Sequence, residues 1–587
     1  MAETLLSPGI LTRENDQTLI TQGPITAGTA ILGPTIKGPV GIPTLVTSYS
    51  DYKSVFGAAF ESASITYEYL TSIAANNYFQ QGGETMLVTR IVSGTFLPSI
   101  GQIAALGTGS GDFTTASFTL ETLSQGEIMN NSGSVSTSGS LVSGSGDNVR
   151  FEIANVDSGS GQFNLLIRQG NDTNANKIIL ESWPGLSLDP NSNNYIERTI
   201  GNQRKTFSTL DGGQINVTGS FINNSRYIRV SAVNSPTFNY FDNEGNFKPE
   251  FTSSLPKIGS GSYLNHLQEG SFTGAKGKVY GSGANGNTKL AMFEDINVAS
   301  IQGLESAYYT ASIALLENQD EYDYELLVAP GVTTQNGAGT VTSLISTVQN
   351  RGDSMTIIDS VNYGSNISAV VTNAATQDSS YAATYWPWVQ VLSNETGKLV
   401  YVPASTVIPG VYATNDRLGA EWFAPAGFNR GGVGGTIQAE RKLSPTNRDT
   451  LYLGKVNPIA TFPGKGVVVF GQKTLQSQAS ALDRINVRRL LIALKNYIVQ
   501  IADNLVFEQN TAATRNNFLA QVNPYLESVQ QRQGLFAFKV VMDASNNGPD
   551  VVDRNQMVGA IYVQPTKTAE FIYLDFNILP TGATFPS

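Results

Sequence analysis

The chain has 587 residues, which is long enough for about two to four domains and at least one sizeable core. Its 36 Lys and Arg against 47 Asp and Glu give a net charge of -11, which argues against a scaffold that holds nucleic acid by counterion release. There is no cysteine, so disulfides, thiolate metal sites and thiol nucleophiles are excluded.

Residues 1–22 are predicted to form an N-terminal arm. An extended piece at Ile10–Thr12 follows Pro8 and Gly9, and these residues carry too few apolar side chains to fold alone. The opening MAETLLSPGI lacks the basic and apolar segments of a signal peptide, and no apolar run approaches the length of about 18 residues that a membrane span needs. We therefore expect a soluble, unsecreted chain.

Residues 23–95 are predicted to form the first part of an α/β core. A short strand is expected at Leu45–Thr47, a helix at Ile65–Phe79, and a second strand at Met86–Val92, bounded by glycines on both sides. A strand, a helix and a strand in this order predict a βαβ unit.

Residues 96–299 differ in composition, because they are rich in Gly, Ser and Asn. A low-complexity tract covers Ser124–Asp147, and short alternating runs such as Phe163–Arg168 are typical of strands. Such a segment buries little apolar area per residue. We therefore expect a β-rich insertion that is exposed on the surface.

The α/β pattern resumes within residues 300–475. Strands are predicted at Glu325–Ala329 and Met355–Asp359, and between them apolar residues recur at helical spacing from Val341 to Val348. This order predicts a parallel sheet with right-handed crossovers. The strand that precedes residue 96 could join the same sheet, which would make residues 96–299 an insertion into one domain.

Residues 476–565 are predicted to form a C-terminal domain. The longest helix of the chain is expected here, with an apolar stripe from Val487 to Leu505. A second helix and two strands are expected after it, at Thr511–Phe518, Leu535–Met542 and Val558–Val563.

Three basic residues fall close together on the edge of the first of these helices, beside the apolar stripe. They are Arg484, Arg488 and Lys495. Such an edge is either a solvated flank or a contact with an acidic partner. The sequence is compatible with both interpretations.

Residues 566–587 are predicted to form a C-terminal arm. Its strand covers Phe571–Ile578, in which alternate apolar side chains point to one side. An extended arm and a strand with one apolar face are what strand exchange between subunits requires. The residues that we expect to make these contacts are Pro8, Gly9, Ile10, Thr12, Phe571, Ile572, Leu574 and Phe576.

No catalytic, metal or cofactor site is predicted. The single histidine, His266, lies in the insertion, so the α/β core has no histidine to serve as the base of a hydrolase triad. Gly466–Thr474 fails as a phosphate-binding loop, because Gln472 separates the glycine from the lysine and VVVF favours a strand. Asp543–Gly548 imitates half of a calcium loop, but Arg554 stands where a glutamate is required. A turn held by Asx side chains is predicted there instead.

Several strings, taken together and in order, resemble contractile phage-type tail sheath proteins. The resemblance covers residues 5 to about 95 and 320 to 580. The strings that carry it include LLSPGILTRE (5–14), GTAILGPTIKGPVGIPTLVTSYSDYKSVFG (28–57), YELLVAPG (324–331), RGDSMTIID (351–359), WFAPAGFNRG (422–431), VNPIATFPGKGVVVFGQKTL (456–475) and FKVVMDASNNGPDVVDRNQMVGAIYVQPTKTAEFIYLDF (538–576).

The resemblance implies a multidomain fold with a subtilisin-like but non-catalytic α/β core, an α+β C-terminal domain, a protruding β-rich insertion and terminal arms that bind neighbours. It implies a virion tail component, assembled in the host cytoplasm, that polymerises helically with itself as stacked six-membered rings. The sheath surrounds an inner tail tube and contracts to drive that tube through the host envelope during genome ejection.

The partners implied by the resemblance are the inner tube, baseplate and tail terminator proteins, without direct contact to nucleic acid or membrane. Arg484, Arg488 and Lys495 then become candidates for tube contact. A phage-tail-like bacteriocin or an injection apparatus would use a similar sheath. The Gly/Ser-rich insertion also suggests a particle surface adhesin, and the α/β core suggests a hydrolase in which another residue replaces the histidine.

Overall fold

The computed structural model describes residues 25–62, 65–92, 94–107, 116–130, 136, 139–208, 213–258, 270–277 and 309–572. Its centre is an eight-stranded sheet in which six central parallel strands are flanked by one antiparallel strand at each edge. In spatial order the strands are β2 (Thr44–Val46), β5 (Met86–Arg90), β1 (Ile25–Gly33), β14 (Tyr322–Thr333), β15 (Met355–Asp359), β16 (Ala382–Trp386), β20 (Asn457–Phe462) and β21 (Gly466–Val469).

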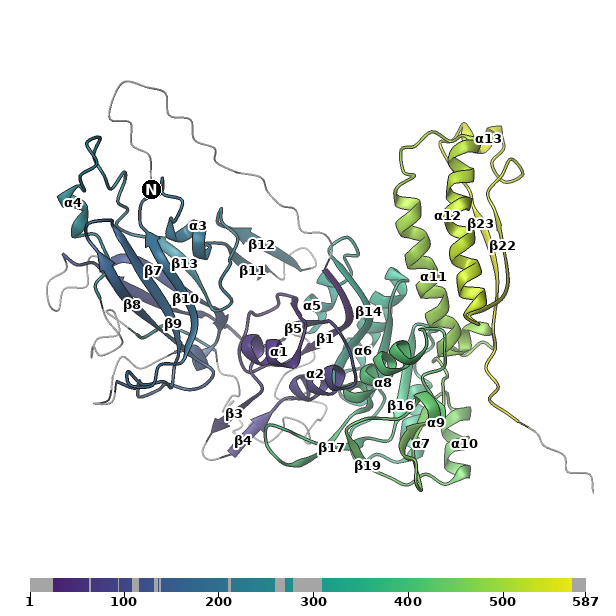
Figure 1. The fold of residues 1–587 in the computed structure, drawn as a ribbon. Coiled ribbons are helices and arrows are strands. Elements are labelled where there is room, and N and C mark those ends of the chain that lie inside the picture. Colours follow the sequence, from purple (N-terminus) through teal and green to yellow (C-terminus); the bar gives the residue numbers. More distant parts are fainter. Residues whose placement is uncertain are drawn as a thin grey trace, which may run out of the picture.

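Helices cover both faces of this sheet, so the core has three layers (Figure 1). On one face lie α1 (Tyr49–Phe56), α2 (Leu70–Gln80) and α8 (Ala404–Leu418). On the other face lie α5 (Thr310–Leu315), α6 (Thr334–Arg351), α7 (Ile367–Ala374) and α10 (Pro445–Leu453). The predicted α/β core is therefore present.

The second half of the core follows the predicted elements closely. Strand β15 has the predicted bounds, and the predicted apolar positions of α6, from Val341 to Val348, are buried. Helix α6 ends at Arg351, whose buried guanidinium donates hydrogen bonds to the carbonyl oxygens of Leu316 and Tyr322. Gly352 follows in the left-handed conformation, with φ of 73°, that a helix C-terminus favours.

The first half of the core corrects the predicted βαβ unit. Strand β2 runs antiparallel to β5, so the parallel crossover joins β5 to β1 instead, and β1 was not among the predicted strands. The helix was also predicted to start too early, because Ile65–Glu68 form strand β4, paired with β3 (Ala59–Ser62). Strand β5 does join the sheet of β14 and β15, as expected.

Strand β1 contains two glycines because helix α2 approaches its backbone closely. A Cβ atom at Gly28 would collide with the hydroxyl of Tyr78, and one at Gly33 with the hydroxyl of Thr71. Glycine weakens the usual strand pattern, which explains why β1 is difficult to recognise from its sequence.

Between β5 and β14 the chain forms a separate β-rich body with its own apolar core, on the opposite side of the sheet domain from the C-terminal helices (Figure 1). Two three-stranded antiparallel sheets contribute to that core, and a two-stranded hairpin lies beside them. The strands are β6 (Pro98–Ala104), β7 (Ala116–Gln125) and β13 (Ile228–Val233); β8 (Val149–Asp157), β9 (Gln162–Gln169) and β10 (Ile179–Ser187); and β11 (Arg204–Ser208) and β12 (Gln214–Thr218).

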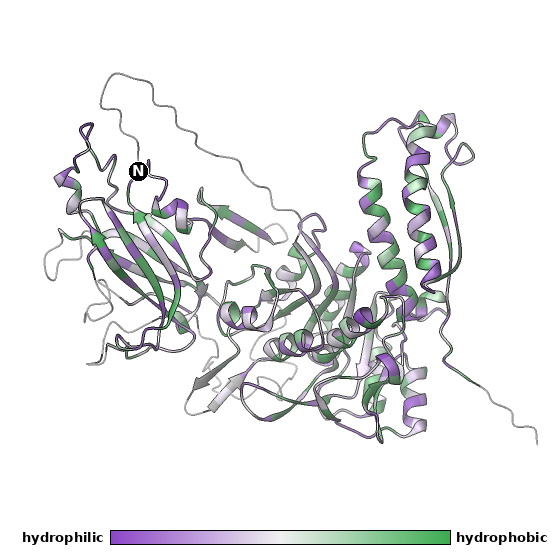
Figure 2. Cartoon of the chain, viewed as in Figure 1, coloured by the Kyte–Doolittle hydropathy of each residue, from purple (hydrophilic) through white to green (hydrophobic). Residues whose placement is uncertain are grey.

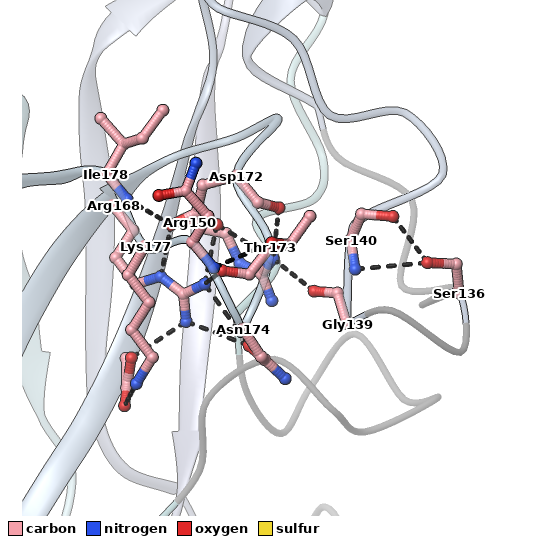
Figure 3. A network of polar contacts seen from close by, with 12 residues as sticks. Ser136, Gly139, Ser140, Arg150, Arg168, Asp172, Thr173, Asn174, Lys177 and Ile178 are labelled. Carbon is pink, nitrogen blue, oxygen red and sulfur yellow. Dashed lines mark hydrogen bonds and ion pairs between the residues drawn. The ribbon is translucent and has the colours of Figure 1, made fainter.

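A buried network of charged side chains fixes two loops of this insertion (Figure 3). The guanidinium of Arg168 donates two hydrogen bonds to Asp172, at 2.7 and 2.8 Å, and one to Glu152 at 2.9 Å. Arg150 contacts Asp172 at 3.3 Å and also donates to the carbonyl oxygen of Gly139. The side chains of Arg150, Arg168 and Asp172 have no exposed surface, so each charge depends on the others for compensation.

Candidate assembly surface

The C-terminal domain consists of two long helices and a two-stranded antiparallel sheet. The helices are α11 (Ile485–Asp503) and α12 (Ala512–Gln531), and the strands are β22 (Leu535–Val541) and β23 (Ala560–Pro565). Figure 2 shows hydrophobic and hydrophilic residues alternating along the turns of both helices, as expected for helices with one buried side. The apolar stripe is confirmed, with Val487, Leu494 and Ile501 buried.

The prediction that the first helix is the longest was wrong. Helix α12 has 20 residues and α11 has 19. Helix α12 continues well past Phe518, through Pro524, to Gln531. A proline inside a helix removes one hydrogen bond and is a strong sequence signal for a helix end, which hides the second half of α12 from sequence reasoning.

The sheet formed by β22 and β23 has one covered face and one exposed face. Phe538, Val540, Ile561 and Val563 pack into the apolar cluster of α11 and α12. Phe536 and Tyr562 remain 76% and 63% exposed. Within the part of the chain that the structure describes, no third strand pairs with either β22 or β23.

Among the described residues, both outer edges of this small sheet therefore lack a paired strand, although the side chains of Gln530 and Asn546 donate to the carbonyl oxygens of Phe536 and Val541 on β22. A two-stranded sheet is marginally stable by itself, and open edges invite pairing with further chains. Here the sheet is supported by two helices, so it is already formed and ready to receive a strand. We refer to β22, β23 and their open edges as the terminal sheet.

The predicted arm residues fall largely outside the described residues. Phe571 and Ile572 are described, and their side chains are 69% and 75% exposed. The other six residues, Pro8, Gly9, Ile10, Thr12, Leu574 and Phe576, lie outside the described residues, as does His266. Their part in strand exchange stays a prediction.

The three basic residues predicted on the edge of α11 make contacts within the chain. Arg484 forms an ion pair with Glu570, with 2.7 Å between Nε and Oε1. Arg488 is only 4% exposed and lies over the ring of Tyr381, 4.0 Å from its centroid. Lys495 is exposed and its ammonium lies 3.4 Å from the hydroxyl of Tyr381. The burial of Arg488 argues against a direct external contact in this conformation, whereas tube contact by Lys495 stays a prediction.

Sequence reasoning missed Arg489, which joins the C-terminal domain to the core. Its guanidinium donates to both oxygens of Asp416 on α8, at 2.8 and 2.6 Å, and lies 3.6 Å from Glu325 on β14. These groups line a cleft of about 710 Å³ between the two domains. Arg489 and Asp416 are 73 positions apart, so no local sequence signal could have linked them.

The motifs discounted as catalytic or metal-binding have structural roles. The VVV of the glycine-containing stretch forms β21, and the Nζ of Lys473 donates to the carbonyl oxygen of Tyr452 at 2.9 Å. Asp543 accepts hydrogen bonds from the amide and hydroxyl of Ser545, as in an Asx turn. Among the described residues, no group of three or more acidic or histidine side chains is arranged to hold a metal ion. None of the described helices is long and apolar enough to cross a membrane.

A buried carboxyl, Asp359, lies at the end of β15 in the core. It accepts hydrogen bonds from the amide of Ser405 at 3.1 Å and from its hydroxyl at 2.6 Å, at the start of α8. The aspartate and serine meet, but no histidine lies among the described residues to act as a base between them. The pair therefore caps a helix.

Asp359 is expected to make the core less stable as the pH rises. Burial raises the pKa of Asp359 to about 6, although the hydrogen bonds from Ser405 and Gly331 oppose this rise. The folded state holds the proton of Asp359 more tightly than the unfolded state. The protonated side chain therefore contributes to the free energy of unfolding below pH 4, and this contribution is lost as the pH rises through about 6. The loss amounts to about 3 kcal/mol.

The measurement is the unfolding free energy of the wild type and of Asp359→Asn at pH 4.5 and 7, followed by tryptophan fluorescence, because Trp386 and Trp388 lie in this core. Asparagine cannot titrate, so the difference in unfolding free energy between the wild type and Asp359→Asn should change with pH. A constant difference would contradict the assignment.

Comparison with known proteins agrees with this architecture. Residues 303–475 match the phage tail sheath protein central domain, and residues 477–579 match the phage tail sheath C-terminal domain. The tail sheath protein of Vibrio phage KVP40 is 42% identical over 185 residues, and that of Enterobacteria phage T4 is 38% identical over 185 residues. Each alignment covers 32% of this chain and only 28% of the relative's length.

A solved structure, the sheath tail protein from Listeria innocua, has a TM-score of 0.50 to this chain at 12% identity. The likeness covers 92% of this chain and 95% of that protein, and it shows a shared fold. The multidomain α/β architecture is therefore that of tail sheath proteins. Over residues 303–475 and 477–579, the chain is therefore similar in sequence to phage tail sheath proteins.

Proposed function

We propose that the chain is the structural subunit of a contractile tail sheath, without enzymatic activity. Subunits polymerise helically around an inner tail tube by strand exchange, and the sheath contracts to drive the tube through the host envelope. The observation that carries this proposal is the terminal sheet, which is supported by helices and open at both edges. Residues 8–21 and 566–580 are the segments that we assign to the terminal sheets of neighbouring subunits.

Strand exchange of this kind has a favourable energy. Each hydrogen bond added to an open edge contributes about 1 kcal/mol net, and burial of apolar side chains such as Ile572 adds to this. The donor segment and the acceptor sheet are different surfaces of the same chain, so the contact is head-to-tail. Such contacts do not close on themselves in a dimer, and repetition produces rings or helical tubes.

The remaining implications of the family resemblance belong to this proposal. They are stacked six-membered rings, contacts with the tube, baseplate and tail terminator proteins, and assembly in the host cytoplasm before the sheath becomes part of the virion tail. The proposal also includes a subtilisin-like core that has no catalytic role. The absence of a histidine from the residues of the described core supports that last point.

Negative-stain microscopy of the purified full-length chain tests the proposal. We expect striated hollow cylinders, because repeated head-to-tail contacts produce a helical lattice. Sedimentation should show that their formation depends steeply on protein concentration. A chain that remains a discrete particle at every concentration, including in the presence of preformed tail tubes, would overturn the proposal.

A further inference from the structure

An extended segment, Thr566–Ile572, leads from the terminal sheet toward the predicted C-terminal arm. We call this segment the strap. The amide of Thr566 donates a hydrogen bond to the carbonyl oxygen of Gly534, which fixes the start of the strap beside β22. From there the strap runs past the start of α11 to the sheet domain, and Figure 1 shows it at the base of the helical pair, below β22 and β23.

Glu570 attaches the strap to the sheet domain. Its carboxylate accepts hydrogen bonds from the hydroxyl of Tyr452 at 2.5 Å, from Nε2 of Gln472 at 2.9 Å and from Nε of Arg484 at 2.7 Å. These three donors come from α10, from the segment after β21 and from the residue that precedes α11. Gln472 also donates to the hydroxyl of Thr568, so one glutamine contacts two strap residues.

Apart from these polar contacts the strap is loosely packed. A groove of about 600 Å³ lies between the strap and the start of α11. Lys567 and Ala569 are exposed, as are Phe571 and Ile572 beyond the carboxylate. Few apolar contacts hold the strap in place, so the hydrogen-bonded carboxylate determines whether it stays against the sheet domain.

We propose that Glu570 is a releasable latch that gives the C-terminal arm two lengths. With the latch closed, the arm leaves the sheet domain at Phe571. With the latch open, it begins at Thr566, and five more residues extend its reach by at most about 17 Å. The proposal rests on the proposed function, because it assigns a length change to an arm that binds a neighbouring subunit.

A two-length arm would let neighbouring subunits separate or rotate without losing their exchanged strands. An arm pulled from outside exerts its force at Phe571, directly beside the carboxylate that holds the strap. The three donors all lie on the sheet domain or at its junction with α11, so they stay in place when the strap leaves. The latch can therefore close again without refolding of either domain.

Limited proteolysis of the unassembled full-length chain tests the latch. Trypsin cleaves after Lys567, whose side chain is exposed, but the protease must also bind the residues that follow it, and hydrogen bonds hold Thr568 and Glu570 against the sheet domain while the latch is closed. Glu570→Gln keeps the size of the side chain and removes its charge, so the strap should open more often. We expect cleavage after Lys567 to be at least about tenfold faster than in the wild type, since charged hydrogen bonds are the strong ones. Tyr452→Phe removes one donor and should show a smaller increase.

The matched control is Glu527→Gln, which changes an exposed glutamate on α12 and should cleave at the wild-type rate. Circular dichroism confirms that each variant is folded. Equal cleavage rates for the wild type and Glu570→Gln would overturn the latch. The cleavage assay uses unassembled protein, so equal cleavage rates would leave the assembly proposal unchanged. Failure of the wild type to form cylinders would overturn the assembly proposal, and it would not alter the cleavage rates.

Discussion

Deletion of residues 1–22 is expected to leave a folded monomer that no longer forms tubes. The deletion stops before β1, which begins at Ile25 and pairs with both β5 and β14 in the centre of the sheet. The core therefore keeps all eight strands, while the terminal sheet of each neighbour loses the segment that we assign to its open edge. Sedimentation and negative-stain microscopy measure the loss of polymer, and circular dichroism measures the retained fold.

A shorter deletion of residues 1–4 is the matched control, because it removes part of the arm but leaves the predicted extended piece from Pro8 to Thr12. This protein should assemble like the wild type. If the longer deletion also forms tubes of normal spacing, the N-terminal arm is not needed for strand exchange and that part of the proposal is wrong.

Arg168→Met is expected to destabilise the insertion by about 3–5 kcal/mol. The substitution leaves the buried carboxylate of Asp172 with one cationic partner, Arg150 at 3.3 Å, and a hydrogen bond of 3.0 Å from the amide of Ile178. An undercompensated buried charge is costly. Thermal unfolding followed by the fluorescence of Trp183, which lies in β10, reports on the insertion. The transition of this part of the molecule should shift to a lower temperature.

Lys177→Met provides the comparison within the same network. Lys177 also contacts Glu152, at 2.8 Å, but its side chain is 35% exposed and water can replace the contact. A loss of less than about 1 kcal/mol is expected. Similar losses in the two variants would show that burial does not determine the cost, in contradiction to our interpretation of the network.

The parts of the fold that the sequence predicted well are those with local patterns. Strand β15 and helix α6 are apolar at the spacing of their own secondary structure, so five to eighteen residues contain the whole signal. Strand β1 was missed because its two glycines serve packing against α2, which a single strand pattern does not reveal. The second half of α12 was missed because Pro524 is tolerated inside that helix.

The candidate assembly surface could be predicted only in part. The alternation in Phe571–Ile578 indicates a strand with one apolar face, and this is visible without a structure. Whether the edges of β22 and β23 are open depends on the elements beside them, which a sequence pattern does not contain. Arg488 was a candidate for external contact, but in the structure its side chain is buried against the ring of Tyr381. The latch at Glu570 joins residues that are 86 to 118 positions apart, so no local pattern contains it.

The crossover from β5 to β14 is where the β-rich body is attached, and its location bears on how relatives of this chain can diverge. The connection from β5 to β14 must place a helix against one face of the sheet, and α5 already packs there. The described residues between 98 and 277 contribute no strand to that sheet. A descendant could enlarge, exchange or lose this appendage and still inherit the same eight-stranded platform.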